Sequence, residues 1–75
     1  NISHEKMIRL IQAMKNNTNV KILCMANIDM PDSVAINIIE MLEENKSLCT
    51  LNIESNLLTG LVIAEIVRAT LKNQT

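Results

Sequence analysis

Apolar residues follow two different spacings along this chain. Between residues 48 and 54, Leu51 and Ile53 alternate with polar neighbours, which is the period of a half-buried β-strand. Residues 32–44 instead carry apolar side chains every three or four positions, as on one face of an amphipathic helix. The apolar positions of that helix are Val34, Ile38, Met41 and Leu42. The pattern therefore predicts short strands that alternate with helices.

The two patterns recur together with a period of 28 residues. Asn17, Asn45 and Asn73 are each 28 positions apart, and apolar residues fall into register under the same shift. The pattern predicts five elements: helix 3–16, strand 21–26, helix 32–44, strand 49–54 and helix 60–72. Thr59 is a residue type that caps helix N-termini, and Pro31 suits a first helical turn.

A strand of about four residues followed by a helix, repeated at this period, is the unit of a leucine-rich repeat. One unit cannot cover its own apolar face, so units stack and their strands form a parallel sheet. We therefore expect an α/β leucine-rich-repeat solenoid of about two and a half 28-residue repeats, in which residues 1–75 are a fragment of one domain. The solenoid would be a right-handed βα superhelix with the sheet on its concave face and the helices on its convex face.

The third copy follows the leucine-rich pattern strictly, and its pattern positions are expected to be structural. These positions are Leu48, Leu51, Ile53, Asn56, Leu58 and Gly60. The amide of Asn56 can both donate and accept hydrogen bonds, so it can satisfy backbone groups where the chain leaves the strand. The second copy has Ile28 in the equivalent place, with Asn27 one residue earlier. Its turn over residues 29–32 is therefore expected to be irregular, with Met30 exposed.

Alternation along the strands also predicts which side chains face away from the core. Because Leu51 and Ile53 point inward, their polar neighbours Thr50, Asn52 and Glu54 point outward. One repeat earlier the outward positions are Ile22, Cys24 and Ala26. This apolar row is either a partner surface or a surface that a neighbouring element covers.

Cys24 and Cys49 are expected to be reduced thiols, buried or half-buried. Cys24 would pair laterally with Asn52, which places Cys49 three residues further along the neighbouring strand. At about 3.3 Å per residue that offset is near 10 Å, which is too far for a disulfide. Neither cysteine has a second cysteine nearby with which to build a metal site.

Composition excludes several classes of partner. The chain has no aromatic residue, so it offers no platform on which single-stranded nucleic acid could stack. Its formal net charge is −1, whereas a phosphate-tracking surface needs an excess of positive charge. No apolar run approaches the roughly 18 to 20 residues of a membrane span. We expect neither nucleic acid nor a membrane as a partner.

The sequence does not point to catalysis. His4 is the only histidine and is expected to be exposed in the first turn of a helix. A single glycine excludes a Gly-rich phosphate loop. Asp29 and Asp32 form a carboxylate pair on a turn, but nothing nearby completes a metal site or an acid/base dyad. We expect no enzyme, no cofactor and no bound metal.

The residues resemble a known family. The stretches 17–21, 32–36 and 40–42 are similar to the C-terminal leucine-rich-repeat domain of tropomodulins and leiomodins. Residues 45–60, NKSLCTLNIESNLLTG, resemble that family's segment NKTLKSLNVESNFITG. The resemblance spans almost the whole chain without gaps and includes the missing asparagine of the second copy. The chain departs from the family at Thr70, where leucine is preferred, and Leu71 is expected to compensate through a small rotation of the helix.

This resemblance implies an actin-binding module that caps the pointed end of actin filaments and regulates filament length. It also implies a place in the cytoplasm on the cytoskeleton, and tropomyosin binding through parts of the parent protein that are absent here. Two alternatives are a leiomodin-like actin nucleator and a leucine-rich-repeat scaffold that regulates an enzyme; a third is a stabilising spacer. Actin contacts are expected on the exposed strand-to-helix turns, at Asp29, Met30, Asp32, Glu54 and Ser55.

Overall fold

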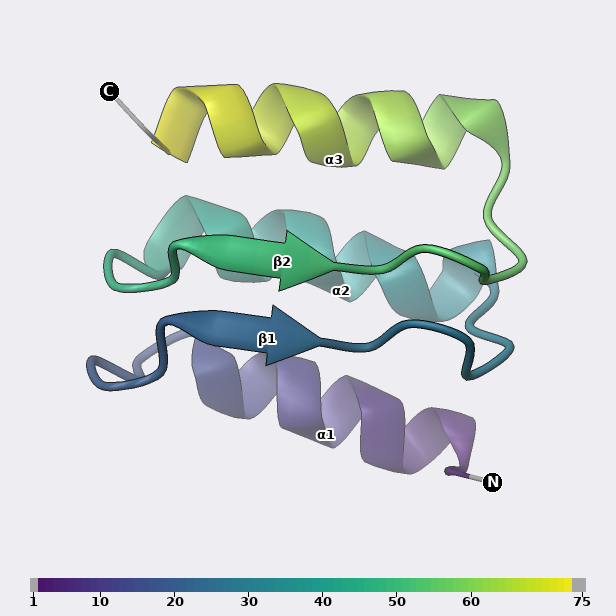
Figure 1. Ribbon diagram of the computed structural model, residues 1–75, viewed down its shortest axis with the longest axis horizontal. Coiled ribbons are helices and arrows are strands. Elements are labelled where there is room, and N and C mark those ends of the chain that lie inside the picture. Colours follow the sequence, from purple (N-terminus) through teal and green to yellow (C-terminus); the bar gives the residue numbers. More distant parts are fainter. Residues whose placement is uncertain (1, 74–75) are drawn as a thin grey trace.

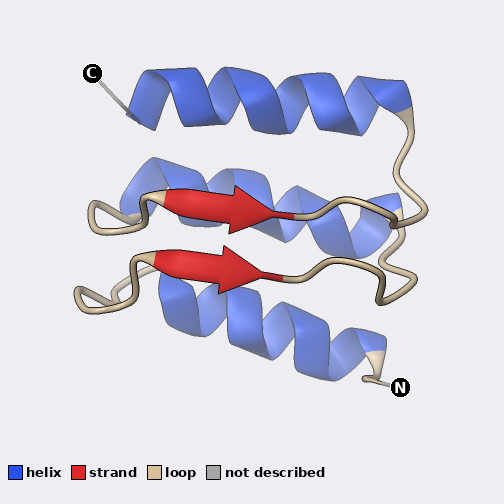
Figure 2. Ribbon diagram, viewed as in Figure 1, coloured by secondary structure: helices blue, strands red, loops and turns tan. Residues whose placement is uncertain are grey.

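A computed structural model describes residues 2–73 and shows three helices that alternate with two strands (Figure 1). The element order is α1 (His4–Met14), β1 (Ile22–Cys24), α2 (Asp32–Glu44), β2 (Thr50–Asn52) and α3 (Gly60–Asn73). The strands lie side by side as a parallel pair, and α2 lies in the row of helices between α1 and α3 (Figures 1 and 2). The arrangement is an α/β fold with a small parallel sheet. No helix within residues 2–73 is long and apolar enough to cross a membrane.

The elements fall where the apolar periodicity places them, with differences at their ends. Helix α1 is shorter than predicted because the Ser3 hydroxyl caps its start, accepting a hydrogen bond from the Lys6 amide, and Lys15 is its C-cap. Pro31 has an extended backbone (φ −89°, ψ 170°) and precedes α2, so it does not belong to the first helical turn as predicted. Each strand has three residues, fewer than predicted, and helix α3 continues to Asn73.

The register of the sheet joins residues that are 28 positions apart. Ile22 pairs with Thr50, Leu23 with Leu51 and Cys24 with Asn52. Both cysteines are free thiols, as expected, but both are exposed, so the prediction of buried or half-buried thiols is wrong. Leu23 and Met25 take the inward positions of β1, and Cys24 between them faces solvent.

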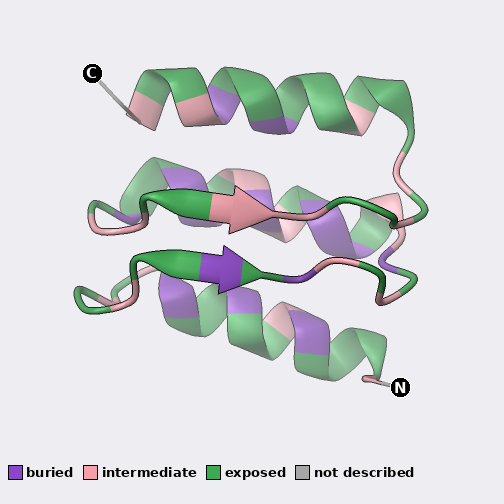
Figure 3. Cartoon of the chain, in the orientation of Figure 1, coloured by how far each residue is buried: buried purple, intermediate pink, exposed green. Residues whose placement is uncertain are grey.

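Buried residues lie where the helices and the sheet face one another (Figure 3), and methionine fills much of this core. All five methionines are buried, alongside aliphatic residues from every helix and from β1. The buried residues of the core are Met7, Ile11, Met14, Leu23, Met25, Met30, Val34, Ala35, Ile38, Met41, Leu42, Ile66 and Ala69. Unbranched, flexible methionine side chains can fill irregular gaps in such a core.

Helix α3 buries two residues, whereas α2 buries five. Ile66 and Ala69 are buried against the core, whereas Val67 is 52% exposed and Leu71 is 61% exposed. Leu71 therefore does not compensate for Thr70, and that prediction is wrong. Instead the Thr70 hydroxyl donates to the Ile66 carbonyl at 2.9 Å, which satisfies the polar group within the helix. Among residues 2–73, only α2 packs against α3, so the opposite side of α3 stays open.

Asparagines spaced by 28 residues hold the helix-to-strand turns together. Asn45 is 1% exposed, and its amide nitrogen donates to the Met14 carbonyl at 2.6 Å and to the Asn17 carbonyl at 3.2 Å. Its side-chain oxygen accepts from the amides of Ser47 at 2.9 Å and Leu48 at 2.7 Å. Asn73 donates in the same way to the carbonyls of Leu42 and Asn45. From the sequence, these asparagines marked only the 28-residue period, and their hydrogen-bonding role was not predicted.

Candidate interaction site at the strand-to-helix turns

The two strand-to-helix turns lie side by side at one edge of the molecule, on the right in Figure 1. Backbone hydrogen bonds join them beyond the ends of the strands. The Asn27 amide donates to the Glu54 carbonyl at 3.0 Å, and the Leu57 amide donates to the Met30 carbonyl at 2.9 Å. Pro31 and Leu57 form an isolated parallel bridge. The sheet-like pairing therefore extends through the turns and positions both of them.

One half-buried side chain, Asn56, organises both turns. Its oxygen accepts from the amides of Ile28 at 3.1 Å and Met30 at 3.0 Å. Its nitrogen donates to the carbonyls of Met25 and Ile53, each at 2.8 Å. Four backbone groups that leave the sheet ladder at the turns are thereby satisfied.

The first turn is irregular, as the missing asparagine predicts. Asn27 and Asp29 both have a left-handed backbone, with φ of 56° and 57°, whereas the second turn has one such residue, Ser55, with φ of 58°. Asn and Asp adopt this conformation more readily than most residues that carry a Cβ. Because Ile28 and Met30 both donate to Asn56, Asp29 is held as a protruding residue between them.

Three of the five predicted contact residues lie exposed at this edge. They are Asp29, Glu54 and Ser55. The carboxylates of Asp29 and Glu54 form no hydrogen bond or ion pair with any residue of the described chain. Each carboxylate is therefore available to a partner that brings cations or hydrogen-bond donors.

The other two predicted contact residues serve the fold. Met30 is 0% exposed, so the expectation that it is an exposed turn residue is wrong. Its backbone bonds to Leu57 and Asn56 fold the turn back onto the core and turn this side chain inward. Asp32 is half-buried, and its carboxylate accepts from the amide and the hydroxyl of Thr59. Asp32 thus joins the start of α2 to the residue that precedes α3.

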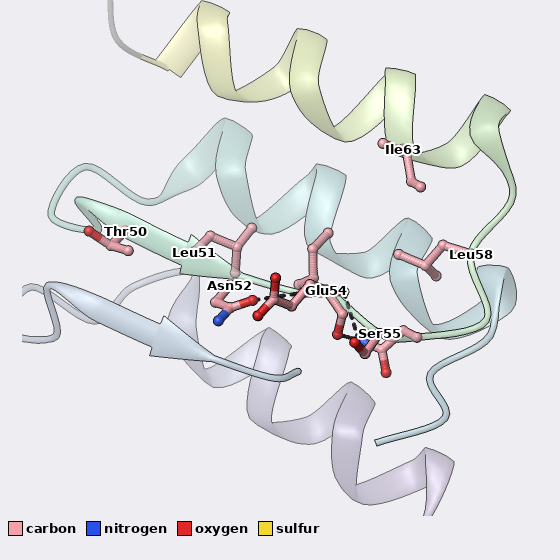
Figure 4. A pocket seen from close by; sticks show the side chains of 9 residues that line it. Thr50, Leu51, Asn52, Glu54, Ser55, Leu58 and Ile63 are labelled. Carbon is pink, nitrogen blue, oxygen red and sulfur yellow. Dashed lines mark hydrogen bonds between the residues drawn. The ribbon is translucent and has the colours of Figure 1, made fainter. Parts of the chain in front are cut away.

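An apolar groove of about 580 Å³ runs along β2 on the side of α3 (Figure 4). It is lined by residues 50–56 together with Leu58 and Ile63. In Figure 4, Leu58 and Ile63 lie on the side of α3, and Glu54 and Ser55 lie where the strand passes into its turn. The groove therefore adjoins the exposed carboxylate edge.

The chemistry of this edge suits recognition of another macromolecule. Within residues 2–73, no three His, Cys, Asp or Glu side chains gather in a way that could hold a metal ion. The ion pairs Glu5–Arg9, Lys15–Glu40 and Glu65–Arg68 involve none of the residues of these turns. Beside the two carboxylates lies Leu57, which is 62% exposed. Leu57 is not among the predicted contact residues, although its place between two pattern positions, Asn56 and Leu58, predicts that it faces outward.

Three comparisons with known proteins point to one and the same family. The family model described as TMOD/LMOD Leucine-rich domain matches residues 1–75. Leiomodin-3 of Mus musculus is 43% identical over 75 residues, which are 100% of this chain and 13% of that protein. Leiomodin-1 of Rattus norvegicus is 42% identical over 74 residues, which are 99% of this chain and 12% of that protein. The chain thus spans about an eighth of the length of these curated relatives.

Two solved structures have the same fold. One, titled Leiomodin-1 Actin-Binding Site 2 (ABS2), is 42% identical with a TM-score of 0.91, over 99% of this chain and 43% of that one. The other, the tropomodulin C-terminal domain of Caenorhabditis elegans, is 38% identical with a TM-score of 0.92, over 97% of this chain and 44% of that one. Sequence and fold together therefore show that the chain belongs to the tropomodulin and leiomodin family, within its leucine-rich domain.

Proposed function

We propose that this chain is an actin-binding module of a longer tropomodulin-like protein that caps the pointed end of actin filaments. One observation carries the proposal: the fold matches a leiomodin-1 structure titled as an actin-binding site, with a TM-score of 0.91 and 42% identity over 99% of the chain. On this proposal the module makes up about two and a half 28-residue repeats of a right-handed leucine-rich-repeat solenoid. The 28-residue offset between paired strand residues supports that arrangement.

The proposed actin contacts are Asp29, Glu54, Ser55 and Leu57 at the strand-to-helix turns. The side chains of the first three are exposed, and both carboxylates lack an internal partner. Asn56 and the paired backbone hold the turns in one conformation, so little ordering entropy is lost when a partner docks. Asp32 supports this surface from within, and Met30 is excluded because it is buried.

Binding at a pointed end would slow both addition and loss of subunits there, and so regulate filament length. The module would act in the cytoplasm on the cytoskeleton, with no catalysis and no cofactor. On this proposal tropomyosin is bound by parts of the parent protein outside this chain, which spans about an eighth of the length of its curated relatives.

A second candidate function is actin nucleation. The curated relatives named above are leiomodins, at 42–43% identity, and the leiomodin-1 structure matches the fold as closely as the tropomodulin structure does. Both functions would use the same actin-binding surface. They differ in whether the parent protein shortens the lag of actin polymerisation or only slows elongation of existing filaments.

The test uses the full-length protein and actin filaments whose barbed ends are blocked. We expect the wild-type protein to slow pointed-end elongation and the double variant Asp29→Asn, Glu54→Gln to slow it about tenfold less effectively. Asparagine tolerates the left-handed backbone of Asp29, so the variant removes charge and leaves the turn unstrained. The matched control is Glu43→Gln, Glu65→Gln, which removes two exposed carboxylates from α2 and α3.

Each outcome of this test decides one point. No slowing by the wild-type protein contradicts capping, and a shortened lag in a separate assay of spontaneous actin polymerisation favours nucleation instead. Equal slowing by wild type, variant and control keeps capping but refutes the contact residues. Equal weakening in variant and control would indicate a nonspecific effect of charge and would also refute them.

A further inference from the structure

The helix-to-strand turns form a second surface at the opposite edge of the molecule, on the left in Figure 1. Three lysines, Lys15, Lys21 and Lys46, line a hollow of about 440 Å³ there, which we call the lysine hollow. The other residues that line it are Asn16, Asn17, Thr18, Glu44 and Ser47. The lysine hollow therefore gathers three of the seven cationic side chains of a chain whose formal net charge is −1.

Charge in the lysine hollow is not balanced within the described chain. Lys15 lies 4.0 Å from Glu40, measured from Nζ to Oε2. The side-chain ammonium groups of Lys21 and Lys46 form no hydrogen bond or ion pair with any other residue in the range 2–73. Glu44 is the single carboxylate in the lining. Two ammonium groups are therefore left for an external anion.

The oxygens of Asn17, in the lining of the lysine hollow, are already engaged and do not compete with such an anion for the lysines. The Asn17 carbonyl already accepts from the Asn45 side chain at 3.2 Å and from the Ser47 hydroxyl at 3.0 Å. The Asn17 side-chain oxygen accepts from the amides of Asn19 at 2.9 Å and Val20 at 2.7 Å. Since these oxygens are engaged, the lysine side chains dominate the recognition chemistry of the surface.

The repeat pattern does not account for these lysines. Residues 28 positions away from Lys15, Lys21 and Lys46 are Glu43, Cys49 and Thr18. Lys15 is the C-cap of α1, where a cation stabilises the negative end of the helix dipole. Lys21 and Lys46 lie outside the helices, so this explanation does not extend to them. Lys15 and Lys21 lie in the turn between α1 and β1, and Lys46 joins them because successive layers of the fold stack.

We propose that the lysine hollow binds an acidic peptide segment of a protein partner. The lysines come from two separate turns in two successive layers, which suits carboxylates spread along an extended chain better than one compact anion. In an extended peptide, side chains on the same face recur about every 7 Å, so successive carboxylates can reach lysines on adjacent layers. This proposal is independent of actin capping, because it concerns a different edge of the molecule and its test contains no actin.

The test uses the full-length protein and a fluorescent octaglutamate peptide, with octaglutamine as the neutral control. We expect octaglutamate alone to bind, and Lys21→Glu, Lys46→Glu to weaken its binding about tenfold, because two attractive contacts become repulsive. The matched control Lys6→Glu, Arg68→Glu makes the same change in charge elsewhere on the domain and is expected to weaken binding less than twofold. Carbodiimide cross-linking, read by peptide mass mapping, is expected to join octaglutamate to Lys21 and Lys46 in preference to Lys6.

Three results would overturn the proposal. Octaglutamate that fails to bind, or that binds no better than octaglutamine, removes the acidic-peptide ligand. Equal weakening by the two variants, or cross-links at Lys6 as frequent as at Lys21, would mean that octaglutamate binds through general electrostatic attraction and not at the lysine hollow. Binding of inositol hexakisphosphate at the lysine hollow without binding of octaglutamate would assign the surface to phosphate groups instead.

Discussion

The carboxylate of Asp32 accepts two hydrogen bonds from Thr59, one from the amide at 2.9 Å and one from the hydroxyl at 2.7 Å. The two residues are 27 positions apart, and each lies at the start of a helix. Because Asp32 begins α2 and Thr59 precedes α3, their hydrogen bonds connect the second strand-to-helix turn to the first. Asp32 is therefore proposed to support the actin surface through Thr59, and its own contact with actin stays a prediction.

We expect the Asp32–Thr59 pair to be coupled in stability. Asp32→Ala and Thr59→Ala should each lower the free energy of unfolding by about 1 kcal/mol, since a charge-assisted hydrogen bond contributes roughly this much at a partly exposed site. The double variant should cost less than the sum of the single variants, because both remove the same interaction. Urea unfolding of the four proteins measures this coupling, and strict additivity would contradict it.

Asn56 should be the most sensitive polar residue of the turns. Asn56→Ala leaves the amides of Ile28 and Met30 and the carbonyls of Met25 and Ile53 without their partner. We expect a loss of about 2–4 kcal/mol in the free energy of unfolding, because unsatisfied, partly buried backbone groups are costly. Asn56→Asp keeps the acceptor and loses the donor, so its cost should be smaller.

The control for Asn56 is Asn16→Ala, at an exposed position that makes no hydrogen bond within the described residues. Its free energy of unfolding should stay within about 0.5 kcal/mol of wild type, as is usual for surface substitutions. Thermal or urea unfolding compares the three variants. Equal stability of Asn16→Ala and Asn56→Ala would show that the asparagine does not hold the turns.

Both cysteines should react in the folded protein. Cys24 and Cys49 are exposed free thiols, so a maleimide should label them in native buffer at rates within about tenfold of those in denaturant. Mass mapping of the full-length protein identifies these two sites even if other cysteines are present. Slow labelling of either thiol would contradict its exposure, and oxidation should not produce a Cys24–Cys49 disulfide.

The local periodicities predict the order and type of the elements because each depends on neighbours in sequence. The lateral pairing of Cys24 with Asn52 follows in the same way from the 28-residue offset. Side chains that depend on distant partners are not predicted. Met30 lies in a polar stretch, and only its bonds to Asn56 and Leu57, 26 and 27 residues away, direct it inward. The exposure of Val67 likewise depends on what packs against α3, and the spacing of apolar residues along that helix does not encode this.

Asp29 and Met30 are neighbours with opposite expected roles, and a matched pair of variants separates them. Met30→Ala removes a fully buried side chain and should cost about 2–4 kcal/mol through the cavity that it leaves. Asp29→Asn removes an exposed carboxylate at a position whose left-handed backbone asparagine tolerates, so stability should change by less than about 0.5 kcal/mol. In pointed-end elongation assays at a temperature where both variants are folded, Asp29→Asn should be the weaker cap. If Met30→Ala weakened capping more than Asp29→Asn did while remaining folded, the contact surface would have to include the core side of the turn, and the assignment of the exposed carboxylates would be wrong.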